Sequence, residues 1–277
     1  MSDSATTELI IEAGHTERNY WRDLFRYREL FYFLAWRDVL VRYKQTVIGV
    51  LWAVLRPLLT MIVFTFVFSR IAKLPAEGVP YPVMVFAAML PWQLFATSLT
   101  EGSGSLINNA NLISKVYFPR LIVPASAVIV SFVDFAISMV LLGVLMAVYR
   151  VTPGASLLVL PFFTILALLA SAGAGVWLAA LNVKYRDFRY VVPFIVQFGL
   201  YISPVGFSSA IVPEKWRMLY ALNPMVGVID GFRWCVSHGR TPFPALSLEL
   251  SLVTVAIVLA TGIWYFRKTE RTFADVI

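Results

Sequence analysis

The stretch LIVPASAVIVSFVDFAISMVLLGVLMAVY, residues 121–149, contains a single charged side chain, that of Asp134. A helix of about 20 apolar residues crosses the hydrocarbon core of a bilayer, whereas a barrel strand needs only about 9–11, so this length favours a helix. Five further apolar runs of sufficient length lie at residues 47–69, 83–100, 157–181, 190–211 and 247–266. The sequence therefore predicts an all-α integral membrane protein with six transmembrane helices.

The composition of the whole chain agrees with this prediction. Of its 277 residues, 59% are hydrophobic and 14% are charged, and the mean hydropathy is +0.76. So few polar side chains cannot cover a water-facing surface, which excludes a soluble globular domain and an intrinsically disordered chain. The formal net charge of +7 is interpreted as membrane topology, and no nucleic acid partner is expected.

An even number of spans places both termini on one side of the membrane. Segments 1–46, 101–120, 182–189 and 267–277 together carry 15 Lys and Arg residues, whereas 70–82, 150–156 and 212–246 carry 7. Because basic loops stay on the cytoplasmic side, the first set and both termini are predicted to be cytoplasmic. The single cysteine, Cys235, excludes an intrachain disulfide.

Four segments follow from this topology. Residues 1–17 are polar and acidic, lack a signal peptide and are expected to form a flexible cytoplasmic N-terminus. Residues 18–45 are expected to form an amphipathic helix and a connector, and residues 46–266 the membrane domain. Residues 267–277 are expected to form a cytoplasmic C-terminus. Neither a repeat nor a linker divides the membrane domain.

The segment before the first span predicts an amphipathic helix. Its basic residues gather on one side of a helical wheel, and such a helix lies in the headgroup plane of a membrane. The alternative is a solvated helix that packs on a partner. The apolar face consists of Tyr20, Leu24, Tyr27, Phe31 and Leu34.

Two predicted cytoplasmic connectors carry short motifs. Residues 108–120 read NNANLISKVYFPR, in which Asn111 as N-cap and Pro119 as stop predict a short helix of about two turns. Residues 182–190 read NVKYRDFRY and combine three basic residues with three aromatic ones. Anchoring at the membrane surface is sufficient to explain this composition.

The loop at residues 212–246 is long for an outward-facing segment. Prolines punctuate two half-apolar stretches, 213–221 and 224–237, and neither is long enough to span. Two short re-entrant helices in the outer leaflet are therefore predicted before the sixth span.

Several residues stand out within the predicted spans. Asp134 is costly inside a membrane unless it is paired or faces a pore, and this interpretation is favoured over a proton relay because no second acid or histidine accompanies it. Arg56 is interpreted as an anchor that reaches the cytoplasmic headgroups. The small residues Ser171, Gly175 and Ala179 predict close helix packing within or between protomers.

Signatures of catalysis are missing from the sequence. It has no GxxxxGK[ST] phosphate loop, no HExxH, no GxSxG elbow and no acidic pair of the DxD type. A transport or channel subunit is therefore favoured over an enzyme.

Four motifs, taken in order, resemble the membrane subunit of type-2 ABC exporters of polysaccharides. They are NLISKVYFPR at 111–120 followed by Pro124, YRD at 185–187, SPV at 203–205 and ALNPM at 221–225. The resemblance covers roughly residues 20–270. The permeases that export lipid-linked O-antigen are the most similar, with capsule and teichoic acid permeases as near relatives.

The resemblance implies a homodimer in a bacterial inner membrane, bound to two copies of a separate ATPase subunit, that moves a lipid-linked polysaccharide out of the cytoplasm. This chain is then no enzyme and holds no cofactor or metal, since ATP and Mg²⁺ belong to the ATPase. The short helix after the second span and the second connector are implied to contact the ATPase. The implied coupling residues are Asn108, Asn111, Leu112, Ser114, Lys115, Tyr117, Lys184, Arg186 and Asp187.

A glycan path needs aromatic rings, on which the CH faces of sugars pack, and polar groups for their hydroxyls. The two half-helices are implied to line its exit. Two other functions stay open: a type-2 ABC exporter of a small amphiphile or drug, and a membrane glycosyltransferase or polymerase. The candidates for the path are Trp92, Phe95, Asp134, Phe198, Tyr201 and Phe207.

Overall fold

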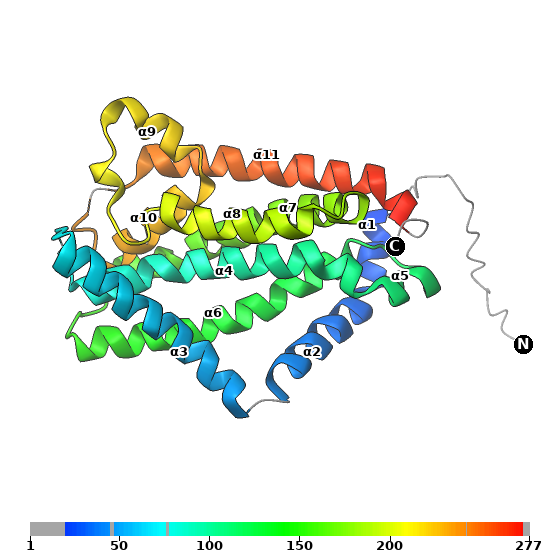
Figure 1. Ribbon diagram of the computed structural model, residues 1–277, viewed down its shortest axis with the longest axis horizontal. Helices are drawn as coiled ribbons and strands as arrows, with labels where there is room; N and C mark the ends of the chain where they lie inside the picture. Colours follow the sequence, from blue (N-terminus) through cyan, green and yellow to red (C-terminus); the bar gives the residue numbers. More distant parts are fainter. Residues whose placement is uncertain (1–19, 45–46, 76–77, 242, 274–277) are drawn as a thin grey trace, which may run out of the picture.

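The computed structural model describes residues 20–44, 47–75, 78–241 and 243–273, and this part of the chain folds into helices without a strand (Figure 1). The predicted N-terminal segment 1–17 lies outside the described residues. In chain order the elements are α1 (Tyr20–Arg26), α2 (Arg28–Lys44), α3 (Val47–Phe64), the π-helix η1 (Thr65–Ile71), α4 (Tyr81–Asn108), α5 (Ala110–Lys115), α6 (Ile122–Val148), η2 (Ala155–Val159), α7 (Leu160–Lys184), α8 (Phe188–Ile202), η3 (Ser209–Ile211), α9 (Glu214–Ala221), α10 (Pro224–Val236), α11 (Ala245–Thr269) and η4 (Glu270–Thr272).

Five of the described helices are long and apolar enough to cross a membrane. The shorter apolar helix α8 follows the fourth of them in the chain. The prediction of an all-α integral membrane protein is confirmed. The five long segments are Leu51–Ile71, Tyr81–Asn108, Ile122–Val148, Ala155–Lys184 and Ala245–Thr272.

The long helices lie side by side along the longest axis of the molecule, and α4 packs against α6, α7 and α10 (Figure 1). We call the end that holds α1, α5 and the last turn of α11 the α5 end, and the opposite one the α9 end. The Tyr20 hydroxyl donates a hydrogen bond to Glu270 (3.0 Å), so the described chain begins and ends at the α5 end, as an even number of spans predicts.

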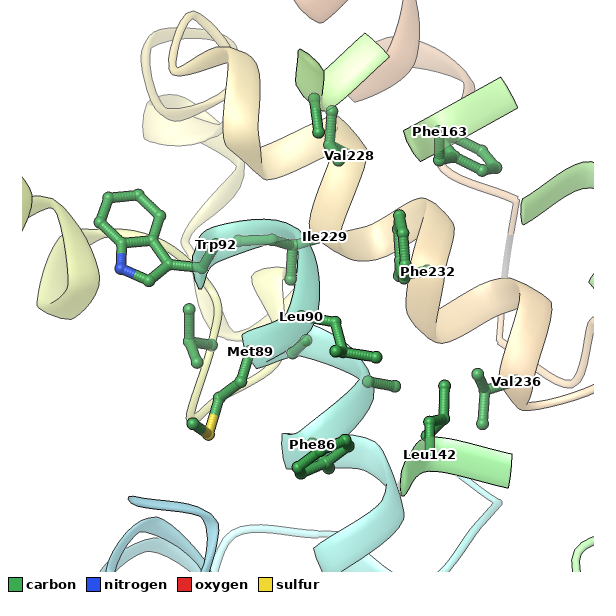
Figure 2. Packing of buried hydrophobic residues seen from close by; sticks show 14 of the residues in the cluster. Phe86, Met89, Leu90, Trp92, Leu142, Phe163, Val228, Ile229, Phe232 and Val236 are labelled. Atoms are coloured by element: carbon green, nitrogen blue, oxygen red, sulfur yellow. The ribbon is translucent and has the colours of Figure 1, made fainter. Parts of the chain in front are cut away.

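Small residues let the helices of the core approach closely, as between α10 and α7. Figure 2 shows Ile229 and Phe232 of α10 beside Leu90 of α4, with Phe163 of α7 close by. A Cβ atom on Gly231 would lie 2.1 Å from the Phe163 ring, so only glycine fits there. Packing of this kind replaces the hydrophobic effect as the force that holds helices together in lipid.

The small residues of the fourth span, predicted to allow close packing, also let helices of this chain approach one another closely. Ser171, Gly175 and Ala179 are buried on α7. A Cβ on Gly175 would lie 3.9 Å from Gly102 of α4, and one on the neighbouring Gly173 would lie 2.8 Å from the backbone of α11. The stripe therefore brings α4, α7 and α11 together.

The second span is longer than the predicted 83–100, because α4 continues to Asn108. Its last turns, EGSGSLIN, have the composition of a loop. Packing overrides this local preference: Gly102 contacts Gly175, and Asn182 of α7 donates to the carbonyl of Ser103 (3.0 Å).

The apolar run 190–211, predicted as the fifth span, contains only the shorter helix α8, because α8 ends at Ile202 and Pro204 interrupts the run. Residues 203–206 are buried without helical structure. Such backbone is tolerated at membrane depth only where protein groups satisfy it. Arg233 donates to the carbonyls of Phe207 (2.6 Å) and Val205 (3.1 Å), and Tyr81 donates to that of Gly206 (2.6 Å).

The two short helices predicted before the sixth span are present as α9 and α10. Most of α10 is buried among α4, α7 and α11, whereas most of α9 is exposed. The side chain of Asn223 caps α10 by accepting from the Met225 amide (3.0 Å), and its amide donates to the Ser203 hydroxyl (3.0 Å). The ALNPM motif thus ties the start of α10 to the SPV motif after α8.

Candidate functional site

A cavity of about 690 Å³ lies between α3, α4, α6 and α8, beside the C-terminal end of α2. This volume falls within the roughly 300–1,000 Å³ of ligand sites. Half of the residues that line it have polar side chains, which is unusual between apolar membrane helices. The polar lining residues are Arg42, Tyr43, Arg56, Thr60, Gln93, Thr97, Thr100, Glu101, Ser131, Asp134, Ser138 and Gln197.

An ion-pair cluster joins three helices at this cavity. The Arg42 guanidinium of α2 lies 2.7 Å from Asp134 of α6 and 3.4 Å from Glu101 of α4. The Tyr43 hydroxyl also donates to Asp134. Burial and the neighbouring carboxylate raise the pKa of Tyr43, so its phenol stays protonated and acts as a donor. Asp134 is therefore paired and also lines the cavity.

A second cavity of about 480 Å³ lies between α2, α4 and α6. Arg42 and Glu101 line both cavities, so the two cavities adjoin at this ion pair. Toward the α5 end this second cavity is lined by Asn108 and by Asn109, which accepts a hydrogen bond from Arg37 of α2 (2.8 Å). A polar route therefore follows α4 from its C-terminal end to the larger cavity.

The structure brings together only part of the predicted path. Trp92 and Asp134 line the large cavity. Phe95 does not line it but packs against Trp92, with ring centroids 5.6 Å apart. Phe198 and Tyr201 are exposed on α8 outside the lining, and Phe207 belongs to the loop that Arg233 holds.

Several lining residues were missed from the sequence because uncharged polar side chains are inconspicuous in an apolar run. Gln93 and Thr97 lie one turn apart on α4, and Gln197 occupies α8. The signal that could have found them is the recurrence of Gln, Thr and Ser within spans that are otherwise apolar. Together they supply donors and acceptors of the kind that sugar hydroxyls bind.

The predicted amphipathic helix is divided into α1 and α2, with a break at Tyr27. Its predicted apolar face turns toward the protein. Tyr20 and Leu34 are buried in a cluster at the α5 end, and Leu24, Tyr27 and Phe31 pack against it. The exposed face carries other aromatic side chains, namely Trp21, Phe25, Tyr32, Phe33 and Trp36. This outward aromatic face, rather than the predicted one, is available to lipid.

The predicted short helix after the second span is present as α5. It starts at Ala110, so the N-cap position belongs to Asn109, and the prediction of Asn111 as N-cap is wrong. Asn108 is the last residue of α4 rather than part of the short helix. The physical reason is that α4 continues almost directly into α5, which leaves no room for a loop before Asn111.

The exposed surface of the α5 end contains most of the predicted coupling residues. Ile113 and Phe118 anchor α5 in the buried cluster, which also contains Val183 before the second connector. Leu112 is half-buried. The exposed members are Asn108, Asn111, Ser114, Lys115, Tyr117, Lys184, Arg186 and Asp187. The exposed side chains of both predicted connectors therefore lie at the same end of the molecule.

Comparison with known proteins identifies the family. The ABC-2 type transporter family matches residues 29–236. The chain belongs to this family. The matched residues run from α2 to α10 and include those that line the cavity, those of α5 and those of the second connector.

Individual relatives of this ABC-2 protein are also similar over most of their length. It is 30% identical over 259 residues to the O-antigen export system permease protein RfbA of Myxococcus xanthus, covering 92% of this chain and 98% of the relative. It is 28% identical over 242 residues to RfbA of Klebsiella pneumoniae, covering 87% and 92%. The polysialic acid transport protein KpsM of Escherichia coli is 20% identical over 236 residues, covering 85% and 91%.

These similarities confirm the predicted resemblance to type-2 ABC permeases for polysaccharide export. The protein is a multi-pass permease subunit of an ABC transporter. Within the described ranges, no three His, Cys, Asp or Glu side chains gather as a metal ion requires.

Proposed function

We propose that this permease exports a lipid-linked polysaccharide, O-antigen, from the cytoplasm across a bacterial inner membrane. Relatives of nearly the same length are named O-antigen export permeases, and this similarity carries the proposal. In this function the chain forms a homodimer and carries no catalytic site. Two separate ATPase subunits bind ATP and Mg²⁺ and supply the energy.

The lining of the large cavity supports a saccharide substrate. Gln93 and Gln197 offer amide donors and acceptors for sugar hydroxyls, and buried Trp92 forms part of the apolar wall beside them. A polymer needs a continuous polar path rather than one tight pocket. The second cavity extends this polar lining toward Asn109 and the α5 end.

The exposed residues of the α5 end support the proposed contact with the ATPase. In this proposal the end faces the cytoplasm, in agreement with the distribution of Lys and Arg along the sequence. A shift of α5 is transmitted to the membrane helices through Ile113, which is buried against them. Lys115 and Arg186 provide charges for docking.

The test is glycan staining of the cell surface and of membrane fractions after depletion of this chain, with polymer synthesis intact. We expect surface glycan to disappear while lipid-linked polymer accumulates inside. Loss of polymer from both places would assign the chain to synthesis, as in the glycosyltransferase hypothesis. An unchanged surface would contradict the proposal and favour export of a small amphiphile.

A further inference from the structure

The turn that follows α11 folds back into the protein. Residues 268–273 read KTERTF, and Phe273, which follows the polar residues of this stretch, is 1% exposed. Its ring packs edge-on against that of Phe266, with centroids 5.3 Å apart. We call residues 270–273 the C-terminal turn. A buried ring directly after charged residues indicates that the rest of the protein holds this turn in one place.

One set of contacts joins the C-terminal turn to α1. The Tyr20 hydroxyl donates to the Glu270 carboxylate (3.0 Å), and the Arg267 guanidinium lies 4.3 Å from the centroid of the Tyr20 ring. Burial and the neighbouring carboxylate raise the pKa of Tyr20, so its phenol stays protonated and acts as a donor. The start of α1 is therefore tied to the end of α11.

A second set of contacts joins the C-terminal turn to the connector between α5 and α6, residues 116–121. The Arg120 guanidinium donates to the carbonyl of Glu270 and lies 6.0 Å from the centroid of the Phe273 ring. Phe118 and Leu121 of the connector belong to the same buried cluster as Phe273. The connector is thus held by residues about 150 positions later in the chain.

Helix α5 depends on this connector for its orientation. It has six residues, of which Ile113 is buried, and isolated helices shorter than about 12 residues are marginal in water. At its start α5 is joined to α4 through Asn109, and at its end it is joined to the connector. Figure 1 shows α1, α5 and the last turn of α11 together at one end of the molecule. Contacts of the connector therefore fix one of the two flanks of α5.

We propose that the C-terminal turn positions α5 for its contact with the ATPase subunit, with Phe273 and Glu270 acting through Arg120. This inference rests on the proposed function, in which the exposed side chains of α5 dock on the ATPase. Because Phe273 is buried, it is a positioning residue that acts through the connector. A segment that is ordered before binding avoids the entropic cost of ordering, so an α5 held in place binds its partner more tightly.

The first test measures amide hydrogen exchange of the full chain in phosphatidylcholine nanodiscs. We expect Phe273→Ala to speed exchange in residues 110–121 about ten-fold, because α5 loses one of its fixed flanks. Exchange in α10 is expected to stay unchanged. Phe273→Leu keeps an apolar side chain in the cluster and is expected to restore most of the protection. Unchanged exchange of α5 in Phe273→Ala would overturn the inference.

The second test measures the affinity for the ATPase subunit. The ATP-hydrolysing subunit that co-purifies with the full chain from its host is released and bound again to nanodiscs that hold each variant. We expect Phe273→Ala and Arg120→Met each to raise the dissociation constant about ten-fold. Tyr20→Phe removes only the hydrogen bond to α1 and is expected to leave it unchanged. An equal rise in Tyr20→Phe would assign the effect to α1 and overturn the inference.

Two control variants separate positioning from loss of stability. Gly227→Ala on α10 brings a Cβ within 2.4 Å of the Ser247 carbonyl oxygen and strains the fold away from the C-terminal turn. Trp264→Ala removes a ring from the same helix as the turn, at a position that is 63% exposed. Both are expected to bind the ATPase subunit like the unaltered chain. A rise in the dissociation constant of Gly227→Ala equal to that of Phe273→Ala would overturn the inference, since lost stability would then be a sufficient cause.

The second test also separates this inference from the proposed function. If no ATP-hydrolysing subunit co-purifies with the unaltered chain, the proposed function fails and the inference fails with it. If the subunit co-purifies and binds Phe273→Ala as tightly as the unaltered chain, the inference alone fails and the proposed function stands.

Discussion

Helices α3 and α4 follow one another in the chain and differ sharply in their surroundings. In the most apolar part of each span, 78% of the α4 residues are buried inside the protein, compared with 11% for α3. The buried helix is the less apolar of the two. Hydropathy measures compatibility with lipid, and in a bilayer the interior of a protein need not be more apolar than its surface.

The way the helices pack on one another divides the molecule into two parts. We call α4, α6, α7, α10 and α11 the packed half, and α2, α3 and α8 the open side. The large cavity lies where they meet. The packed half is joined by close backbone contacts at glycines, whereas α2 is joined to it by side-chain ion pairs and hydrogen bonds. We therefore expect changes in the packed half to affect stability, and changes on the open side to affect transport.

The largest loss of stability is expected from Arg233→Met. Arg233 is 3% exposed, and its guanidinium donates to the carbonyls of Val205 and Phe207. Leaving two buried carbonyls without donors is expected to lower the free energy of unfolding by about 4 kcal/mol, measured by SDS titration. Arg240→Met is the control, since exposed Arg240 donates to only one carbonyl, that of Gly78 (3.0 Å). An equal effect of both changes would contradict the expectation.

The next largest loss of stability is expected from Gly227→Ala. The added Cβ would lie 2.4 Å from the backbone oxygen of Ser247 on α11, which cannot move aside as a side-chain tip can. Overpacking is expected to cost about 2–3 kcal/mol in the same titration. The matched change is Gly143→Ala, where nothing lies within 4 Å. A loss of similar size at Gly143 would show that the close contact of Gly227 is irrelevant.

Asp134→Asn tests the ion pair that joins α2 of the open side to α6 of the packed half. Arg42 keeps Glu101 but loses its closer partner, so the expected loss of stability is about 1–2 kcal/mol. The main effect is expected on α2, whose amide hydrogen exchange should become faster while that of α10 stays unchanged. Faster exchange throughout the chain would instead indicate general destabilisation.

The smallest effect on stability is expected from Phe198→Ala. Phe198 is 50% exposed on α8 and contacts the Phe194 ring, with centroids 4.2 Å apart. Truncating it is expected to change the free energy of unfolding by less than about 0.5 kcal/mol. A loss of 2 kcal/mol or more would show that α8 belongs to the packed half.

The sequence was sufficient to predict five long apolar helices, the short helix after the second span and the pair of short helices before the last. Periodicity and length carry these features, because each depends on residues near in the chain. The end of α4 was missed because EGSGSLIN is helical through the contacts of Gly102 and Ser103 with Gly175 and Asn182, which lie on α7. The end of α8 at Pro204 was overlooked although the signal was present.

The candidate site was harder to predict because it depends on which helices are neighbours. Asp134 was correctly singled out as paired or facing a pore, yet nothing in the sequence indicates that Arg42 is its partner, 92 residues earlier. Aromatic composition suggested Phe198 and Tyr201, which face away from the cavity, and overlooked Gln93 and Gln197, which line it.

In the proposed function, the substrate passes along the cavity at the open side. A photoreactive benzoylphenylalanine is placed at Gln197, which lines the cavity, or at Ile257, which is 57% exposed on α11 of the packed half. Cells that are exporting glycan are irradiated, and the chain is probed for attached glycan. We expect a glycan-bearing adduct at position 197 and none at 257. Adducts at 257 alone, or equally at both positions, would contradict it.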